Sequence, residues 1–129
     1  MLDDIGAGTC SALEHGYLER VERAHGLPVA ERQVRASSRG PVYRDVLYEA
    51  QSLIVELDGR TFHDGVADRS RDLDRDLDAA VDGATTVRLG WGQVYGTPCR
   101  TAQRVGVLLQ QRGWPGSVTS CAECSRQAA

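Results

Sequence analysis

The chain has 129 residues, 41% of them hydrophobic and 26% charged, with a formal net charge of -3. This length suits one compact domain with a single core and leaves room only for a small second module. The acidic balance argues against a strongly basic nucleic-acid binder, although acids gathered at a metal site would hide a local basic face. All 15 basic residues are arginines, which excludes every mechanism that needs a lysine.

Apolar residues are too scattered to form a membrane span, which needs roughly 20 in succession. The first residues, Met1-Leu-Asp-Asp4, are acidic, whereas a secretory signal begins with basic residues. We therefore expect a cytoplasmic protein with no membrane partner. In that compartment the four cysteines are expected to be thiols or metal ligands rather than disulfides.

Apolar periodicity and stop signals predict elements in the order αβββαβα. The first helix begins with the capping-box spacing of Ser11-Ala-Leu-Glu14, and His15 and His25 are expected at the surface or at a helix end. The predicted elements are a helix over 11–25, an extended piece over 31–36, strands over 41–48 and 52–58, a helix over 67–81, a strand over 85–89, and a helix from Thr97-Pro98 to 113–116. This order predicts a mixed α/β (α+β) sheet flanked by helices.

The helix predicted over 67–81 has one apolar stripe, and aspartates and arginines cover the remainder. Opposite charges recur three positions apart along it, as in Arg71/Asp74 and Arg75/Asp78. This pattern is typical of a solvated helix that pairs its own charges. The functional alternative is that Arg71 or Arg75 approaches a phosphate backbone. The stripe consists of Leu73, Leu77, Ala80 and Val81.

Acidic side chains interrupt the two strand-like runs over 41–48 and 52–58. If these runs form a hairpin about a loop between Ala50 and Gln51, positions that sum to 101 face each other, and Asp45 lies opposite Glu56. Carboxylates facing each other across a ladder repel, and a divalent cation between them turns that repulsion into ligation. The hairpin thus predicts a Mg²⁺ or Mn²⁺ site, although any single strand acid can simply face water.

The cysteines predict a second metal site. Cys121-Ala-Glu-Cys124 has the spacing of tetrahedral zinc ligands, and Cys99 at a helix start supplies a third thiolate. Cys10 or a histidine would be the fourth ligand. A structural Zn²⁺ would pin the C-terminal tail, residues 117–129, to the domain. The alternative is an incidental thiol pair in a disordered tail.

Together these residues carry a family resemblance. Three strings in order, followed by an Asp/Arg-rich helix, resemble the restriction-endonuclease-like PD-(D/E)xK superfamily, and most closely its very-short-patch-repair-like (Vsr-like) endonucleases and their actinobacterial-type relatives. The resemblance covers residues 11–115 and implies a Vsr-like endonuclease domain over 1–116. The strings are Ser11-Ala-Leu-Glu14, Tyr43-Arg-Asp45 and Val55-Glu-Leu-Asp-Gly-Arg-Thr-Phe-His63.

The resemblance assigns roles residue by residue. Asp45 matches the metal-binding aspartate, Glu56 the (D/E) position, Asp58 the position where other members have lysine, and Glu14 an acid from the first helix. His63 matches the second histidine of the repair enzymes' His-Gly-x-x-x-His pattern, where the first has become Asp58. The repair enzymes also carry a structural zinc, but its ligand pattern does not align with the cysteines of this chain.

The expected activity is a Mg²⁺- or Mn²⁺-dependent DNA endonuclease in which His63 transfers a proton. Arg60, Arg71 and Arg75 are the expected DNA contacts. A monomer would nick one strand and a dimer would cut both. The alternatives are a nuclease-fold module of a defence or toxin–antitoxin system that binds nucleic acid or protein without cutting, and a purely structural zinc protein.

Overall fold

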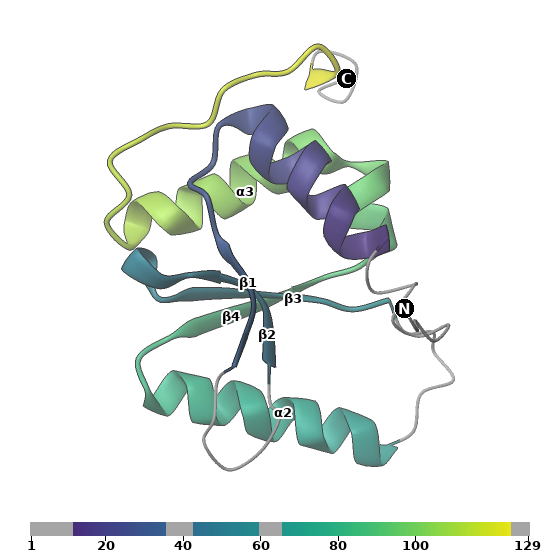
Figure 1. Cartoon of the computed structure of the whole chain (residues 1–129), viewed down its shortest axis with the longest axis vertical. Coiled ribbons are helices and arrows are strands. Elements are labelled where there is room, and N and C mark those ends of the chain that lie inside the picture. Colours follow the sequence, from purple (N-terminus) through teal and green to yellow (C-terminus); the bar gives the residue numbers. More distant parts are fainter. Residues whose placement is uncertain (1–11, 36–42, 60–65, 125–129) are drawn as a thin grey trace.

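A four-stranded mixed sheet forms the middle layer of the domain (Figure 1). The computed structural model describes residues 12–35, 43–59 and 66–124. The strand order is β1-β2-β3-β4, in which β1–β2 and β2–β3 are antiparallel and β3–β4 are parallel. The strands are β1 (Glu31–Arg35), β2 (Tyr43–Tyr48), β3 (Leu53–Leu57) and β4 (Thr85–Leu89).

Helices cover both faces of the sheet (Figure 1). α2 (Val66–Val81) covers one face and makes the crossover that the parallel strands β3 and β4 require. The other face carries α3 (Pro98–Gln111) and the N-terminal helical segment, residues 12–25. The predicted mixed α/β architecture with flanking helices is therefore confirmed. No helix in the described ranges has both the length and the apolar character needed to cross a bilayer.

The predicted element boundaries lie within a few residues of the observed ones, but the helical geometry differs. The N-terminal helical segment begins as α-helix over 12–16, widens into the π-helix η1 (Tyr17–Glu22) and tightens into the 3-10 helix η2 (Arg23–His25). Two further short helices were not predicted, η3 (Glu49–Gln51) within the β2–β3 hairpin and η4 (Gly92–Gly96) before α3. Apolar spacing reports a buried helical face, but does not distinguish one hydrogen-bond period from another.

The hydrophobic core lies between the sheet and the α3 side. Leu53, Val55 and Leu57 of β3 point into it, so Ile54 and Glu56, which alternate with them, face the α2 side. The remaining core members come from the N-terminal helical segment, β2, β4, η4, α3 and a short connection: Leu13, Tyr17, Val21, Leu27, Ala30, Val46, Tyr48, Leu89, Val94, Ala102, Val105 and Leu109.

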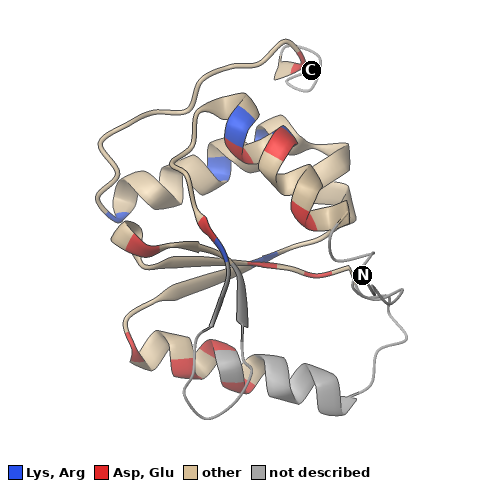
Figure 2. Cartoon of the chain, viewed as in Figure 1, with Lys and Arg blue, Asp and Glu red and all other residues tan. Residues whose placement is uncertain are grey.

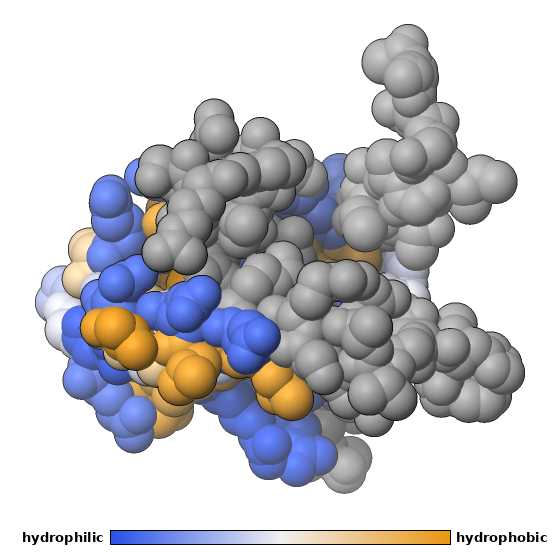
Figure 3. Space-filling view, turned by 90° about the horizontal axis from the view of Figure 1, so that it is seen from below, coloured by the Kyte–Doolittle hydropathy of each residue, from blue (hydrophilic) through white to orange (hydrophobic). Residues whose placement is uncertain are grey.

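The apolar stripe predicted for α2 faces solvent instead of the sheet. Leu73, Leu77 and Val81 are 62%, 63% and 78% exposed, whereas the small Ala79 is the buried position at 3%. The helix therefore meets the sheet through a small side chain and through Asp76, which forms a 2.9 Å ion pair with Arg88 of β4. Figure 3 shows this side of the molecule, with apolar surface between hydrophilic residues. The predicted intrahelical pairs of Arg71 and Arg75 involve side chains outside the described part of the chain.

A buried polar network joins the N-terminal helical segment to the sheet. The hydroxyls of Tyr17 and Tyr48 lie 2.7 Å apart, and the Tyr48 hydroxyl donates to Oε1 of Glu22 at 3.0 Å. Burial raises the pKa of both tyrosines, which stay neutral. Burial also raises the pKa of Glu22, and the hydrogen bond from Tyr48 and the charge of Arg32 offset only part of this effect.

We expect the substitution Glu22→Gln to stabilise the protein more at pH 8 than at pH 5. Because the folded-state pKa of Glu22 lies above its ordinary value of 4.5, the folded state binds this proton more tightly than the unfolded chain. The contribution of protonated Glu22 to the stability of the folded state is complete below the pKa of Glu22 in the unfolded chain. It is lost as the pH rises through the pKa of Glu22 in the folded state. Glutamine keeps the shape without the buried charge. Urea denaturation at both pH values, with saturating zinc, measures the difference.

The matched control for this prediction is Glu19→Gln. Glu19 lies in the same helical segment but is exposed, and it pairs with Arg23 at 2.7 Å. Its removal should change the free energy of unfolding by less than about 0.5 kcal/mol at either pH. A Glu22→Gln variant whose advantage over wild type shrinks as the pH rises would contradict the assignment.

Candidate functional site

Three distant parts of the chain bring a histidine and three cysteines together. Each residue offers one ligand atom, and the ligand atoms of His25, Cys99, Cys121 and Cys124 all lie within 4.8 Å of one another. His25 ends η2, Cys99 follows Pro98 in the first turn of α3, and the two remaining cysteines lie in a turn of the tail. The tail runs back above α3 to reach the cluster (Figure 1).

The spacings within this Cys₃His cluster are those of ligands around one tetrahedral ion. The Cys99 and Cys121 sulfur atoms lie 3.4 Å apart, those of Cys121 and Cys124 lie 3.7 Å apart, and His25 Nε2 lies 3.5 Å from the Cys124 sulfur. Zinc–ligand bonds of about 2.3 Å to sulfur and about 2.0 Å to nitrogen, at tetrahedral angles, imply sulfur–sulfur separations of about 3.8 Å and nitrogen–sulfur separations of about 3.6 Å. The cluster can therefore bind a metal ion with little rearrangement.

The imidazole of His25 is held in the orientation that a metal ligand needs. The side chain is fully buried, and its Nδ1 lies 3.0 Å from the backbone oxygen of Val21. When Nδ1 donates its proton to that carbonyl, Nε2 is left with its lone pair directed at the three sulfur atoms. Gly26 follows with a φ of 68°, a left-handed conformation that suits glycine and turns the chain away from the cluster.

The thiols of the cluster differ in acidity. Burial raises the pKa of Cys99, and the neighbouring Cys124 and Cys121 thiols raise it further. For Cys121, burial also opposes ionisation, but hydrogen bonds from the Cys99 thiol, from the Glu123 backbone and from the Cys124 thiol outweigh it and lower the pKa. Cys121 therefore ionises before Cys99, and a thiolate is the form that binds metal.

Contacts outside the cluster hold the tail in place. The backbone N–H of Thr119 donates to the carbonyl of His25 at 2.8 Å. Val118 packs against the hydrophobic core, and a Cβ at Gly106 of α3 would overlap one of its methyl groups. A glycine at this position allows the tail to lie directly on α3, which delivers Cys121 and Cys124 to the cluster.

The structure brings Cys99, Cys121 and Cys124 together, as expected for a metal site. The sequence leaves the fourth ligand open between Cys10 and a histidine, and the structure places His25 there, a residue expected at the surface or at a helix end. It does end a helix, but it is buried. The one usable signal was a histidine directly before the Gly26 stop. Cys10, the alternative fourth ligand, lies outside the described residues.

The second candidate site is the group of three acidic residues at one end of the β2–β3 hairpin: Asp45 in β2, Glu56 in β3 and Asp58 directly after β3. The register pairs Val46 with Val55, Leu47 with Ile54 and Tyr48 with Leu53, and every pair sums to 101 as predicted. The register ends at the pair of Val46 and Val55; continued by one residue it would bring Asp45 opposite Glu56, and the Asp45 side chain lies outside the described part. Glu56 itself is buried, at 6% exposure.

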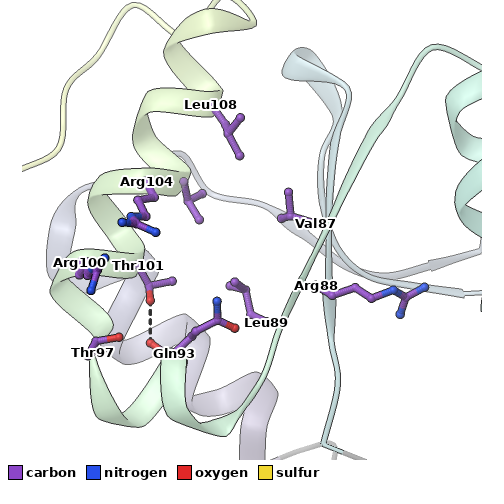
Figure 4. Close-up of a pocket in the computed structure, with 10 residues that line it drawn as sticks. Val87, Arg88, Leu89, Gln93, Thr97, Arg100, Thr101, Arg104 and Leu108 are labelled. Carbon is purple, nitrogen blue, oxygen red and sulfur yellow. Dashed lines mark hydrogen bonds between the residues drawn. The ribbon is translucent and has the colours of Figure 1, made fainter.

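The neighbours of Glu56 are charged. Arg88 of β4 is its partner in the parallel ladder, and in Figure 4 the Arg88 side chain points toward the α2 side. Asp58 follows β3 directly, and its backbone N–H donates to the carbonyl of Leu89 at 2.8 Å. The carboxyl ends of β3 and β4 are thereby joined beside the acidic group, at the edge of a sheet where sites are commonly built.

Other predicted site residues lie apart from this group or outside the described ranges. Glu14 lies 3.9 Å from the guanidinium of Arg32 on the α3 side of the sheet, whereas Glu56 faces the α2 side. Arg60 and His63 lie outside the described residues. The backbones of Arg71 and Arg75 belong to α2, but their side chains are likewise outside the description.

Neither cluster can be assigned by similarity. No protein-family model matches the chain, and the searches of curated proteins and of solved structures return no significant match.

Proposed function

We propose that this chain is a metal-dependent DNA endonuclease with a restriction-endonuclease-like fold. The observation that carries the proposal is the β2–β3 register, in which positions summing to 101 pair and whose continuation by one residue would bring Asp45 opposite Glu56. Two acids at facing positions of a ladder repel unless a cation lies between them. A buried Glu56 makes that cost larger, since a carboxylate with little solvent depends on positive charge nearby.

The arrangement of strands supports the same proposal. The hairpin that carries the acids continues through α2 into the parallel strand β4, which is the element order of the superfamily that the motifs resemble. The acids lie where β3 ends beside β4, at the carboxyl edge where a substrate can approach.

The available donors fit a hard divalent cation. Asp45, Glu56 and Asp58 offer carboxylate oxygens, which are the ligands that Mg²⁺ and Mn²⁺ prefer. When bound, the ion supplies Lewis acidity toward a phosphodiester and lowers the pKa of a coordinated water. His63 is placed by the motif to move the proton, since its ordinary pKa is near neutrality. Arg88, beside Glu56 in the ladder, provides a fixed cation in a chain without lysine.

The Cys₃His cluster has a separate role as a structural zinc site. Four protein ligands fill a tetrahedral coordination sphere and leave no open position for a water or substrate. The ion would join the N-terminal helical segment, α3 and the tail, so that residues 117–124 belong to the endonuclease domain. This site requires reduced thiols, in accord with the cytoplasmic location that we propose.

The test is cleavage of supercoiled plasmid in Mg²⁺ or Mn²⁺, compared with chelator and with the variant Asp45→Ala. We expect metal-dependent conversion to open-circle product, lost in the variant and in chelator. Linear product without an open-circle intermediate would indicate that a dimer cuts both strands. DNA bound but never cut by wild type, with either metal, would replace this proposal with a non-catalytic binding module.

A further inference from the structure

A pocket of about 400 Å³ lies between β4 and α3, apart from both metal clusters. Its floor is apolar, formed by Val87 and Leu89 of β4 with Val105 and Leu108 of α3. Figure 4 shows Leu89 and Leu108 directed toward the space between strand and helix. The volume falls within the range of about 300–1,000 Å³ that small-molecule sites occupy.

Two arginines also line this pocket. Arg100 and Arg104 lie one helical turn apart on α3 and both line the pocket. Both are exposed, and neither forms a hydrogen bond or ion pair with any residue that the structure describes. The α3 sequence contains no acidic residue that could neutralise them. Figure 2 shows basic residues on α3 and acidic residues on the described part of α2, on opposite faces of the sheet.

Other arginines of the described chain have internal partners. Arg23 pairs with Glu19, Arg88 pairs with Asp76, and Arg112 donates to the backbone oxygens of Gln51 and Gly83. Arg88 also lines the pocket, but Figure 4 shows its side chain directed away. Arg100 and Arg104 are therefore available to an external anion, and two guanidinium groups one turn apart match the oxygens of a phosphate.

Polar groups beside the floor are fixed by the fold. Thr101 donates to the backbone oxygen of Gln93 at 2.8 Å, and the Gln93 side-chain oxygen accepts from the backbone N–H of Gly90 at 3.0 Å. The Gln93 amide is thus oriented, and its NH₂ group remains a hydrogen-bond donor at the wall of the pocket. Trp91, directly before η4, and Tyr95 of η4 stack at 5.5 Å, but neither lines the pocket, and the Tyr95 hydroxyl donates to the backbone oxygen of Ala12 in the N-terminal helical segment.

From this combination we infer that the pocket binds one nucleotide unit of a nucleic-acid strand. The base lies on the apolar floor with its edge toward Gln93, and the phosphate lies between Arg100 and Arg104. A bare anion site would not need the apolar floor, and a purely apolar ligand would leave two guanidinium groups unused. The assignment to a nucleic-acid strand rests on the proposed function, because a free nucleotide offers the same base and phosphate.

The experiment measures binding in Ca²⁺, to suppress cleavage, by calorimetry at fixed salt. The ligands are a short single-stranded oligonucleotide, a deoxynucleoside 5′-monophosphate and inorganic phosphate. We expect the oligonucleotide to bind best and inorganic phosphate worst. Arg100→Gln combined with Arg104→Gln should weaken oligonucleotide binding at least about tenfold, since each removes a charge-assisted contact. Arg23→Gln, which removes one positive charge elsewhere, serves as the control for each of the two arginine substitutions made singly and should change oligonucleotide binding less than about twofold.

The apolar floor is tested separately with Leu108→Gln. Leu108 is half-buried, and melting temperature verifies that the variant folds. It should weaken the monophosphate and the oligonucleotide but leave inorganic phosphate unchanged. Equal binding of phosphate and nucleotide would overturn the base site, and an oligonucleotide no tighter than the monophosphate would overturn the assignment to a strand.

Cleavage assays separate this inference from the proposed function. Unchanged oligonucleotide binding by the double arginine variant, with wild-type cleavage intact, overturns the pocket assignment alone. Arginine-dependent oligonucleotide binding by a wild type that never cleaves supports the pocket and overturns the endonuclease.

Discussion

Replacing His25 with alanine should release zinc and lower the melting temperature by roughly 10 °C or more. The wild type, purified in reductant, should contain one zinc per chain, measured by atomic emission. Because the folded cluster holds its four ligand atoms within 4.8 Å, the free energy of metal binding becomes free energy of folding. A loss of about 3 kcal/mol corresponds to a shift of this size in a domain of this length.

Comparing Cys10→Ser with His25→Ala identifies the fourth ligand. Cys10→Ser should keep one zinc per chain, whereas Cys121→Ser and His25→Ala should both lose it. His25→Ala also removes the hydrogen bond to the Val21 carbonyl, so a second variant, His25→Cys, restores a ligand without that bond and should regain zinc. Zinc retained in His25→Ala and lost in Cys10→Ser would instead make Cys10 the fourth ligand. Zinc absent from wild type would contradict the site altogether.

Loss of zinc should also weaken binding at the proposed nucleotide pocket. Cys99 and Arg100 are neighbours in the first turn of α3, so an ion that fixes the thiolate also fixes the start of the helix that carries both pocket arginines. The tail, which reaches the cluster through Thr119 and Val118, packs along the same helix. An ion bound by the cluster would therefore be linked to the proposed nucleotide pocket through α3, since no residue of the cluster lines that pocket.

The strand register was predictable because the loop between β2 and β3 is short, and a short hairpin loop allows few pairings. The sequence of Leu53–Leu57 adds little, since all five positions are buried and no alternation marks one face. The element ends were predictable because stop signals are properties of single residues, as at Gly83, which has a φ of 90°. The facing position of Asp45 and Glu56 stays a prediction from the continuation of this register.

Two other features depended on tertiary contacts that no sequence spacing reports. His25 became a candidate ligand only because a tail almost a hundred residues later folds back over α3, and a lone buried histidine carries no such signal. In α2, Ala79 and the ion pair of Asp76 with Arg88 decide which side meets the sheet, so the larger apolar residues face outward. Periodicity identifies a stripe, but the neighbouring surface determines whether that stripe is buried.

Glu56→Gln should reduce DNA cleavage at least about 10³-fold, which corresponds to roughly 4 kcal/mol of transition-state stabilisation. Glutamine keeps the volume of the buried side chain, so the variant should fold, but it replaces a charged oxygen ligand with a neutral amide. The loss should therefore appear in the rate at saturating DNA, with DNA affinity in Ca²⁺ changed little. Single-turnover cleavage and a melting curve measure the two quantities.

The control is Glu49→Gln, which removes an exposed acid from η3 of the same hairpin. It should cleave within about twofold of wild type, because a solvated carboxylate at the hairpin turn holds no metal ion. Asp45→Asn should resemble Glu56→Gln, and both should weaken Mn²⁺ binding measured by calorimetry in the absence of DNA. Full activity in either carboxamide variant would remove the facing carboxylates from the mechanism, whatever the register of the strands that carry them.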